Sequence, residues 1–175
     1  MSDFDDAIPT VLRHEGGFEN DINDPGGATN YGVSLRWLKA EGLIEGLEEE
    51  DKTQDEVMAV KLMTRAEAAA FYKCYWWDVY KYGYIISQPV ATKVFDTAVN
   101  LGPSRAHRFL QYALGVLQDG VLGPKTFNET NATPSAQLVV KLQSLQASYY
   151  RNLVARNIKL AGFLNGWMNR AYDRN

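Results

Sequence analysis

Several features that would point to common functions are scarce in this sequence. Its 175 residues include one cysteine, Cys74, so the chain cannot form an internal disulfide and is expected to fold in a reducing compartment. The only two histidines, His14 and His107, are far apart, so a zinc site is not expected. The formal net charge is −3 without a block of Lys and Arg, which argues against binding to nucleic acid.

Targeting segments are also missing. The N-terminus, MSDFDDAIPT, is acidic and lacks the basic region and apolar run of a secretory signal peptide. No window of about 18 apolar residues occurs, so we expect neither a transmembrane helix nor stable insertion into a membrane. The sequence therefore predicts synthesis in the cytoplasm, and a function outside it would need a separate route of export or release.

The sequence does contain many amphipathic helical patterns. Phe4, Ile8, Val11 and Leu12 recur at helical spacing, which predicts a helix over residues 3–15 that ends at two glycines. Further helix starts and ends are predicted from an N-cap at Ser34, a capping box at Thr64 and Glu67, a helix between Pro103 and Gly115, and an N-cap at Thr133 with Pro134 as the first helical residue.

Residues 18–33 lack this periodicity and are rich in turn residues, which favours a small β-hairpin. The fold class expected from these patterns is mainly α, a compact helical fold of two lobes with a small β-hairpin near residues 18–33.

Glu15 is the first candidate for catalysis. It stands at the predicted end of the first helix, where the partial negative charge of the helix terminus disfavours a carboxylate. Nearby apolar side chains would further favour the protonated form by excluding water. A carboxylic acid that keeps its proton near neutral pH is what a glycosidase needs to protonate a leaving oxygen. Ordinary helix capping explains a glutamate before two glycines equally well.

A glycosidase also needs a second polar group opposite the acid. Asp24 and Thr29 follow Glu15 in the turn-rich segment, and a hairpin folded over the helix end would bring them near it. Two carboxyl groups roughly 6.5–9.5 Å apart leave room for a water and predict inversion at the anomeric carbon. Asp21 is an alternative to Asp24, because the sequence does not fix the register of the hairpin.

Two motifs resemble a known family. The segment EGGF…NDPGGATNYGVS is similar to the signature of glycoside hydrolase family 108, the N-acetylmuramidases known as secretion activators or phage-type endolysins. The later segments VFDTAVNLGPSRAHRFLQYALG and DGVLGPKT resemble the predicted peptidoglycan-binding half of those proteins. The resemblance spans roughly residues 5–170.

The resemblance implies a lysozyme-like fold with a catalytic region over residues 1–88 and a helical peptidoglycan-binding region over residues 89–175, packed as one compact unit. It implies cleavage of the β-1,4 bond between N-acetylmuramic acid and N-acetylglucosamine, with Glu15 as general acid. By analogy with tailed-phage lysozymes, Asp24 and Thr29 would be its helpers. The implied partner is the peptidoglycan glycan strand, without cofactor or metal, and a holin or export system would bring the enzyme to the wall and periplasm.

Other polar and aromatic residues are candidates for binding sugar. Tyr31 lies two residues after Thr29. Trp76, or its neighbour Trp77, belongs to an aromatic-rich helix whose faces would suit a pyranose ring but would also suit the core. Asn100 and Asp96 share a helix face, where they would bond acetamido groups of the substrate or cap neighbouring backbone.

Three other functions remain open at this stage. A lytic transglycosylase would use the same acid without a partner that positions water, and a non-catalytic module would bind the wall without cleaving it. A helical DNA-binding protein is disfavoured by the charge balance.

Overall fold

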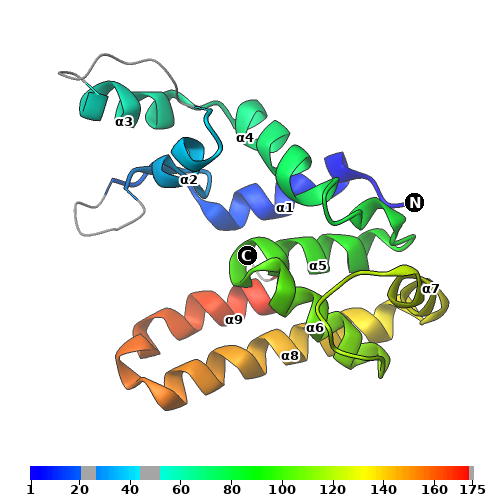
Figure 1. Cartoon of the computed structure of the whole chain (residues 1–175). Helices are drawn as coiled ribbons and strands as arrows, with labels where there is room; N and C mark the ends of the chain where they lie inside the picture. Colours follow the sequence, from blue (N-terminus) through cyan, green and yellow to red (C-terminus); the bar gives the residue numbers. More distant parts are fainter. Residues whose placement is uncertain (21–26, 44–51, 174–175) are drawn as a thin grey trace. The chain divides into compact units, whose positions relative to one another are not determined.

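The computed structural model describes residues 1–20, 27–43 and 52–173, and over these ranges the chain is mainly α (Figure 1). This confirms the expected fold class and the small hairpin. None of the described helices is long and apolar enough to cross a membrane. The elements are α1 (Phe4–Glu15), β1 (Thr29–Asn30), β2 (Val33–Ser34), α2 (Leu35–Ala40), α3 (Lys52–Leu62), α4 (Arg65–Tyr72), η1 (Lys73–Trp77), η2 (Tyr82–Tyr84), α5 (Gln88–Leu101), α6 (Pro103–Leu114), α7 (Pro124–Ala132), α8 (Ser135–Arg156), η3 (Ile158–Phe163) and α9 (Leu164–Tyr172).

The chain divides into two compact units. The first unit contains Met1–Ile8 and Trp76–Asn175, and the second contains Pro9–Tyr75. The chain passes from one unit to the other at Pro9, inside α1, and within the π-helical turn η1. At both places the regular α-helical hydrogen bonding is interrupted, by a residue without N–H in α1 and by wider turns in η1. The division after residue 88 expected from the resemblance remains a prediction.

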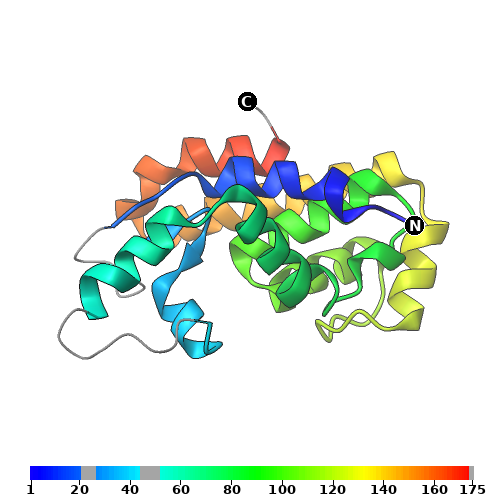
Figure 2. The same cartoon turned by 90° about the horizontal axis from the view of Figure 1, so that it is seen from above.

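The first unit is a set of packed helices. Helix α5 packs against α6 and α8, and α8 and α9 lie antiparallel side by side (Figures 1 and 2). The centre of this unit is formed by large side chains that are at most 1% exposed, among them Tyr82, Phe95, Leu110 and Tyr150. Burial of such side chains supplies most of the stability of a helical unit.

A buried polar group joins α5 to α9 in the same unit. The guanidinium of Arg170 donates to the carboxylate of Asp96 at 2.9 Å, and both residues are buried. Lys93 Nζ donates to the main-chain carbonyls of Arg170 and Ala171 at 3.3 and 2.7 Å. Burial lowers the pKa of Lys93 to about 8, against the opposing effect of Asp96. Asp96 thus forms a buried ion pair with Arg170, a role that neither alternative from the sequence named.

The predicted helix signals are largely confirmed, with one correction. Ser34 accepts a hydrogen bond from Trp37 N–H at the start of α2, and Thr64 and Glu67 form the capping box of α4. The prediction that Thr133 is the N-cap of the long helix is wrong, because α8 begins one residue later and has Pro134 at its cap position. Thr133 instead ends α7, where its hydroxyl donates to the carbonyl of Glu129 at 2.7 Å.

Candidate active site

Glu15 is the last residue of α1, as the sequence predicts, and belongs to the second unit. Gly16 follows at φ +76°, in the left-handed region that ends a helix. The side chain of Glu15 is half-buried. The acid therefore stands at a helix end with part of its surface accessible, which a residue that reacts with a polymer requires.

A hairpin with a two-residue turn lies beside this acid. Strands β1 and β2 pair antiparallel, with Thr29 opposite Ser34 and Asn30 opposite Val33. The turn residues Tyr31 and Gly32 have φ angles of +49° and +77°. Two successive positive φ values are those of a type I′ turn, whose twist matches that of the strands it joins. The hairpin predicted within residues 18–33 is thus present, with its turn at Tyr31 and Gly32.

Asn30 fixes this hairpin on the second unit. Its side chain is buried, and its amide nitrogen lies 3.1–3.2 Å from the carbonyl oxygens of Val60, Lys61 and Met63. These carbonyls belong to the end of α3 and the residue after it, where helical partners are lacking. A single amide therefore caps one helix and anchors the strand that carries Thr29.

The turn of the hairpin lies against Glu15 and Tyr72. A Cβ atom at Gly32 would stand 2.6 Å from Glu15 Oε2 and 2.5 Å from the Tyr72 hydroxyl. Both polar groups therefore lie against the side of Gly32 where any other amino acid would carry its Cβ atom. Tyr72 is buried and donates its hydroxyl hydrogen to the carbonyl of Tyr31 at 3.0 Å. The hairpin turn, the acid and this hydroxyl are therefore held together.

Tyr72 is the site residue that the sequence did not single out. It belongs to the aromatic-rich segment 71-FYKCYWW-77, whose composition does not distinguish residues of the core from residues of a site. Its hydrogen bond to Tyr31 joins positions 41 residues apart in the chain. No local pattern marks such a contact.

The other predicted catalytic residues are placed as follows. Thr29 is half-buried in β1, and its main chain pairs with Glu19 through two N–H···O bonds of 2.8 Å. Asp24 and its alternative Asp21 lie outside the described residues. The structure thus brings Glu15 and the hairpin of Thr29 into one unit, and the second acid remains a prediction.

The predicted sugar-binding residues lie in both units. Tyr31 is half-buried at the hairpin turn, in the second unit, and its carbonyl accepts a hydrogen bond from Tyr72. Trp76, in the first unit, is half-buried with its ring centre 6.2 Å from that of Tyr80. Asn100, also in the first unit, accepts a hydrogen bond from the hydroxyl of Tyr150 at 2.5 Å. Contacts of these three residues with substrate remain predictions.

Comparison with known proteins adds to this geometry. The family model Glycosyl hydrolase 108 matches residues 8–102, and that of the Predicted Peptidoglycan domain matches residues 105–172. A solved structure titled "Structure of Brucella abortus SagA" is similar, with 28% identity and a TM-score of 0.75 over 97% of this chain and 90% of that chain. A search of curated proteins gave no match. The first match includes Glu15, the hairpin and Tyr72, and the second includes most of α6 and all of α7 and α8.

Proposed function

The chain belongs to the glycosyl hydrolase 108 family, and we propose that it acts as an N-acetylmuramidase with Glu15 as general acid. Family membership and the peptidoglycan domain make it a glycoside hydrolase that acts on peptidoglycan, with the mainly α, lysozyme-like fold. The bond that we propose it cleaves is the β-1,4 bond between N-acetylmuramic acid and N-acetylglucosamine.

The observation that carries this proposal is the position of the Glu15 carboxylate. It lies at a helix end, half-buried, against a glycine and beside a turn held by Tyr72. A general acid must be fixed within hydrogen-bonding reach of the leaving oxygen, because misplacement slows proton transfer steeply. Because Gly32 has no side chain, the carboxylate has room to lie against the turn.

The proposed mechanism follows from these groups. Glu15 donates its proton to the bridging oxygen as the glycosidic bond breaks, and positive charge develops on the sugar ring. Asp24 and Thr29 position the attacking water or stabilise that charge, with Asp21 as the alternative acid. Tyr31, Trp76 and Asn100 are proposed to bind the sugars. We also propose that a holin or an export system brings the enzyme to the wall.

Digestion of purified peptidoglycan tests the proposal. The wild type should release products with reducing N-acetylmuramic acid ends, identified by mass spectrometry. The Glu15→Gln variant should lose roughly 10²–10⁴-fold in rate, the usual contribution of a general acid. Glu41→Gln is the matched control, because Glu41 is exposed in the same unit and loses the same charge.

Each other result points to a different function. Anhydro-muramic ends in the products of the wild type would indicate a lytic transglycosylase and not a hydrolase. Wall binding with no cleavage by either protein would indicate a binding module. Full activity of Glu15→Gln would remove Glu15 from the mechanism.

A further inference from the structure

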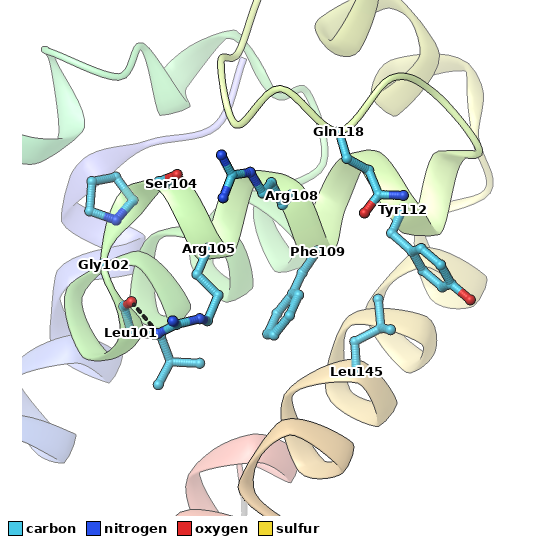
Figure 3. Close-up of a pocket in the computed structure, with 10 residues that line it drawn as sticks. Leu101, Gly102, Ser104, Arg105, Arg108, Phe109, Tyr112, Gln118 and Leu145 are labelled. Carbon is cyan, nitrogen blue, oxygen red and sulfur yellow. Dashed lines mark hydrogen bonds between the residues drawn. The ribbon is translucent and has the colours of Figure 1, made fainter. Parts of the chain in front are cut away.

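A pocket of about 510 Å³ lies over one face of α6 in the first unit (Figure 3). The large side chains of α6 that line it are those of Arg105, Arg108, Phe109 and Tyr112. Arg108 and Phe109 lie three and four residues after Arg105, and Tyr112 lies four and three residues after them, so one face of the helix carries all of them. Gln118 and Leu145, from the following turn and from α8, complete the walls (Figure 3).

Arg105 is held in position by contacts that leave most of its donors available. Its guanidinium lies over the ring of Tyr149, with 4.6 Å from Cζ to the ring centre, and donates one hydrogen to the carbonyl of Leu101 at 3.3 Å. The ring of Tyr149 also packs edge-on against Phe109, at 6.0 Å between ring centres. A guanidinium has five N–H groups, and within the part of the chain that the structure describes one of them is bonded, which leaves four for a ligand that accepts hydrogen bonds in a fork geometry.

The turn at residues 118–120 lies beside Arg108 and contributes Gln118 to the wall of the pocket. Gly120 has φ +81°, and a Cβ there would stand 3.4 Å from Arg108 Nε, so the turn lies directly on this side chain. Gln111 holds the turn, because its side chain accepts from Gly120 N–H at 2.8 Å and donates to Asp119 at 2.6 Å. His107 adds a hydrogen bond to the carbonyl of Gly120 at 2.9 Å.

Asp119 is an acid that interacts electrostatically with Arg108. The pKa of its carboxyl is lowered, chiefly by the N–H of Val121 and the amide of Gln111, with Arg108 as a smaller cause. The carboxylate of Asp119 is therefore bonded mainly to its own turn. One negative charge against two guanidiniums leaves the pocket cationic, in a chain whose formal net charge is −3.

The aromatic residues supply apolar surface between these charges. Phe109 is half-buried, whereas Tyr112 is 60% exposed. Exposed aromatic rings beside arginines are typical of binding surfaces, in which Tyr, Phe and Arg are enriched. The pocket therefore suits a ligand with carboxylates and small apolar groups.

We propose that this pocket binds the carboxylate-bearing peptide stem of peptidoglycan, an inference that rests on the proposed function. The glycan strand presents neutral hydroxyl and acetamido groups, and the muramic carboxyl is used in the amide bond to the stem. The negative charges of the substrate are thus on the stem, where alanine methyl groups also occur. A stem lying along α6 places its carboxylates on Arg105 and Arg108 and its apolar groups on Phe109 and Tyr112.

Binding of soluble wall fragments by calorimetry tests this site, with the Glu15→Gln protein used so that no fragment is cleaved. The disaccharide with its tripeptide stem should bind, and the same disaccharide with its muramic carboxyl capped as a methylamide, and so without any carboxylate, should bind about tenfold more weakly, a difference of about 1.4 kcal/mol. The double variant Arg105→Gln/Arg108→Gln should lose the preference for the stem. Tyr112→Ala, which removes an exposed side chain, should weaken stem binding without altering the melting temperature.

The control is Arg151→Gln/Arg156→Gln, which removes two exposed arginines of α8 and changes the net charge equally. It should bind the stem as strongly as the parent. If both double variants weakened stem binding equally, general charge attraction and not a specific site would explain the binding. Equal binding of both fragments, or binding of glycerol phosphate in preference to the stem, would overturn the proposal. These outcomes concern binding alone, so they leave the cleavage test of Glu15 independent.

Discussion

Replacing Gly32 with alanine should disable the active site by displacing its acid. The added Cβ would stand 2.5 Å from the Tyr72 hydroxyl, 2.6 Å from Glu15 Oε2 and 2.9 Å from Glu15 Cγ. Ordinary van der Waals contact begins near 3.4 Å, so the carboxylate oxygen must move by about 0.8 Å. Two of the three contacts are with Glu15 itself, and the carboxylate cannot keep its position beside the new methyl group.

Two separate effects set the size of the loss. Alanine at φ +77° strains the backbone by roughly 1–2 kcal/mol, which should lower the free energy of unfolding by that amount. Displacement of a catalytic group by about 1 Å costs roughly 100-fold in rate. We therefore expect a folded protein with a modestly lower melting temperature and a kcat reduced roughly 10–100-fold.

Gly115→Ala is the control that separates the effect of backbone strain from that of the steric clash with Glu15. Gly115 has φ +70°, and nothing lies within 4 Å of a Cβ at that position. It should show a similar loss of stability and unchanged kcat in a peptidoglycan-digestion assay, with folding of both variants checked by circular dichroism. A folded Gly32→Ala protein with wild-type kcat would refute the claim that Glu15 acts from the position seen against Gly32.

Two further variants test the hairpin anchor and the buried lysine. Tyr72→Phe keeps the buried ring but removes the hydroxyl that donates to the carbonyl of Tyr31. We expect the free energy of unfolding, measured by chemical denaturation, to fall by about 0.5–1.5 kcal/mol, and kcat to be lower. Wild-type values for both quantities would show that the hydroxyl does not position the turn. Lys93 has a pKa of about 8 in the folded chain and an ordinary value of 10.5, so between these pH values the unfolded chain binds a proton that the folded chain does not. Stability should therefore rise by roughly 1–3 kcal/mol as pH increases from 8 to 10, as seen in melting temperatures, and Lys93→Met should abolish that rise.

The parts of the fold that the sequence predicted are those set by local chemistry. Gly16 and Gly115 end helices at positive φ, and Ser34 and Thr64 cap helices through bonds to residues three positions away. The hairpin was predicted from its density of turn residues. In each case the deciding contact lies within a few residues along the chain, which is the range that a sequence pattern can express.

The parts that were missed depend on contacts between distant positions. Asn30 bonds carbonyls 30 to 33 residues away, and Tyr72 bonds Tyr31 from 41 residues away. Asp96 was ambiguous because its partner, Arg170, is 74 residues further along the chain. A buried polar side chain and one at a binding site look alike in the sequence, since only the tertiary partner distinguishes them.

The charge of the chain constrains how it can bind its substrate. A protein with a formal net charge of −3 is not drawn to an anionic wall by its overall field, which salt screens beyond about 8–10 Å in any case. Affinity must then come from short-range contacts, and two sets of residues are built to provide them. We propose that the hairpin and Glu15 bind the neutral sugars, and that the arginine face of α6 binds the charged stem.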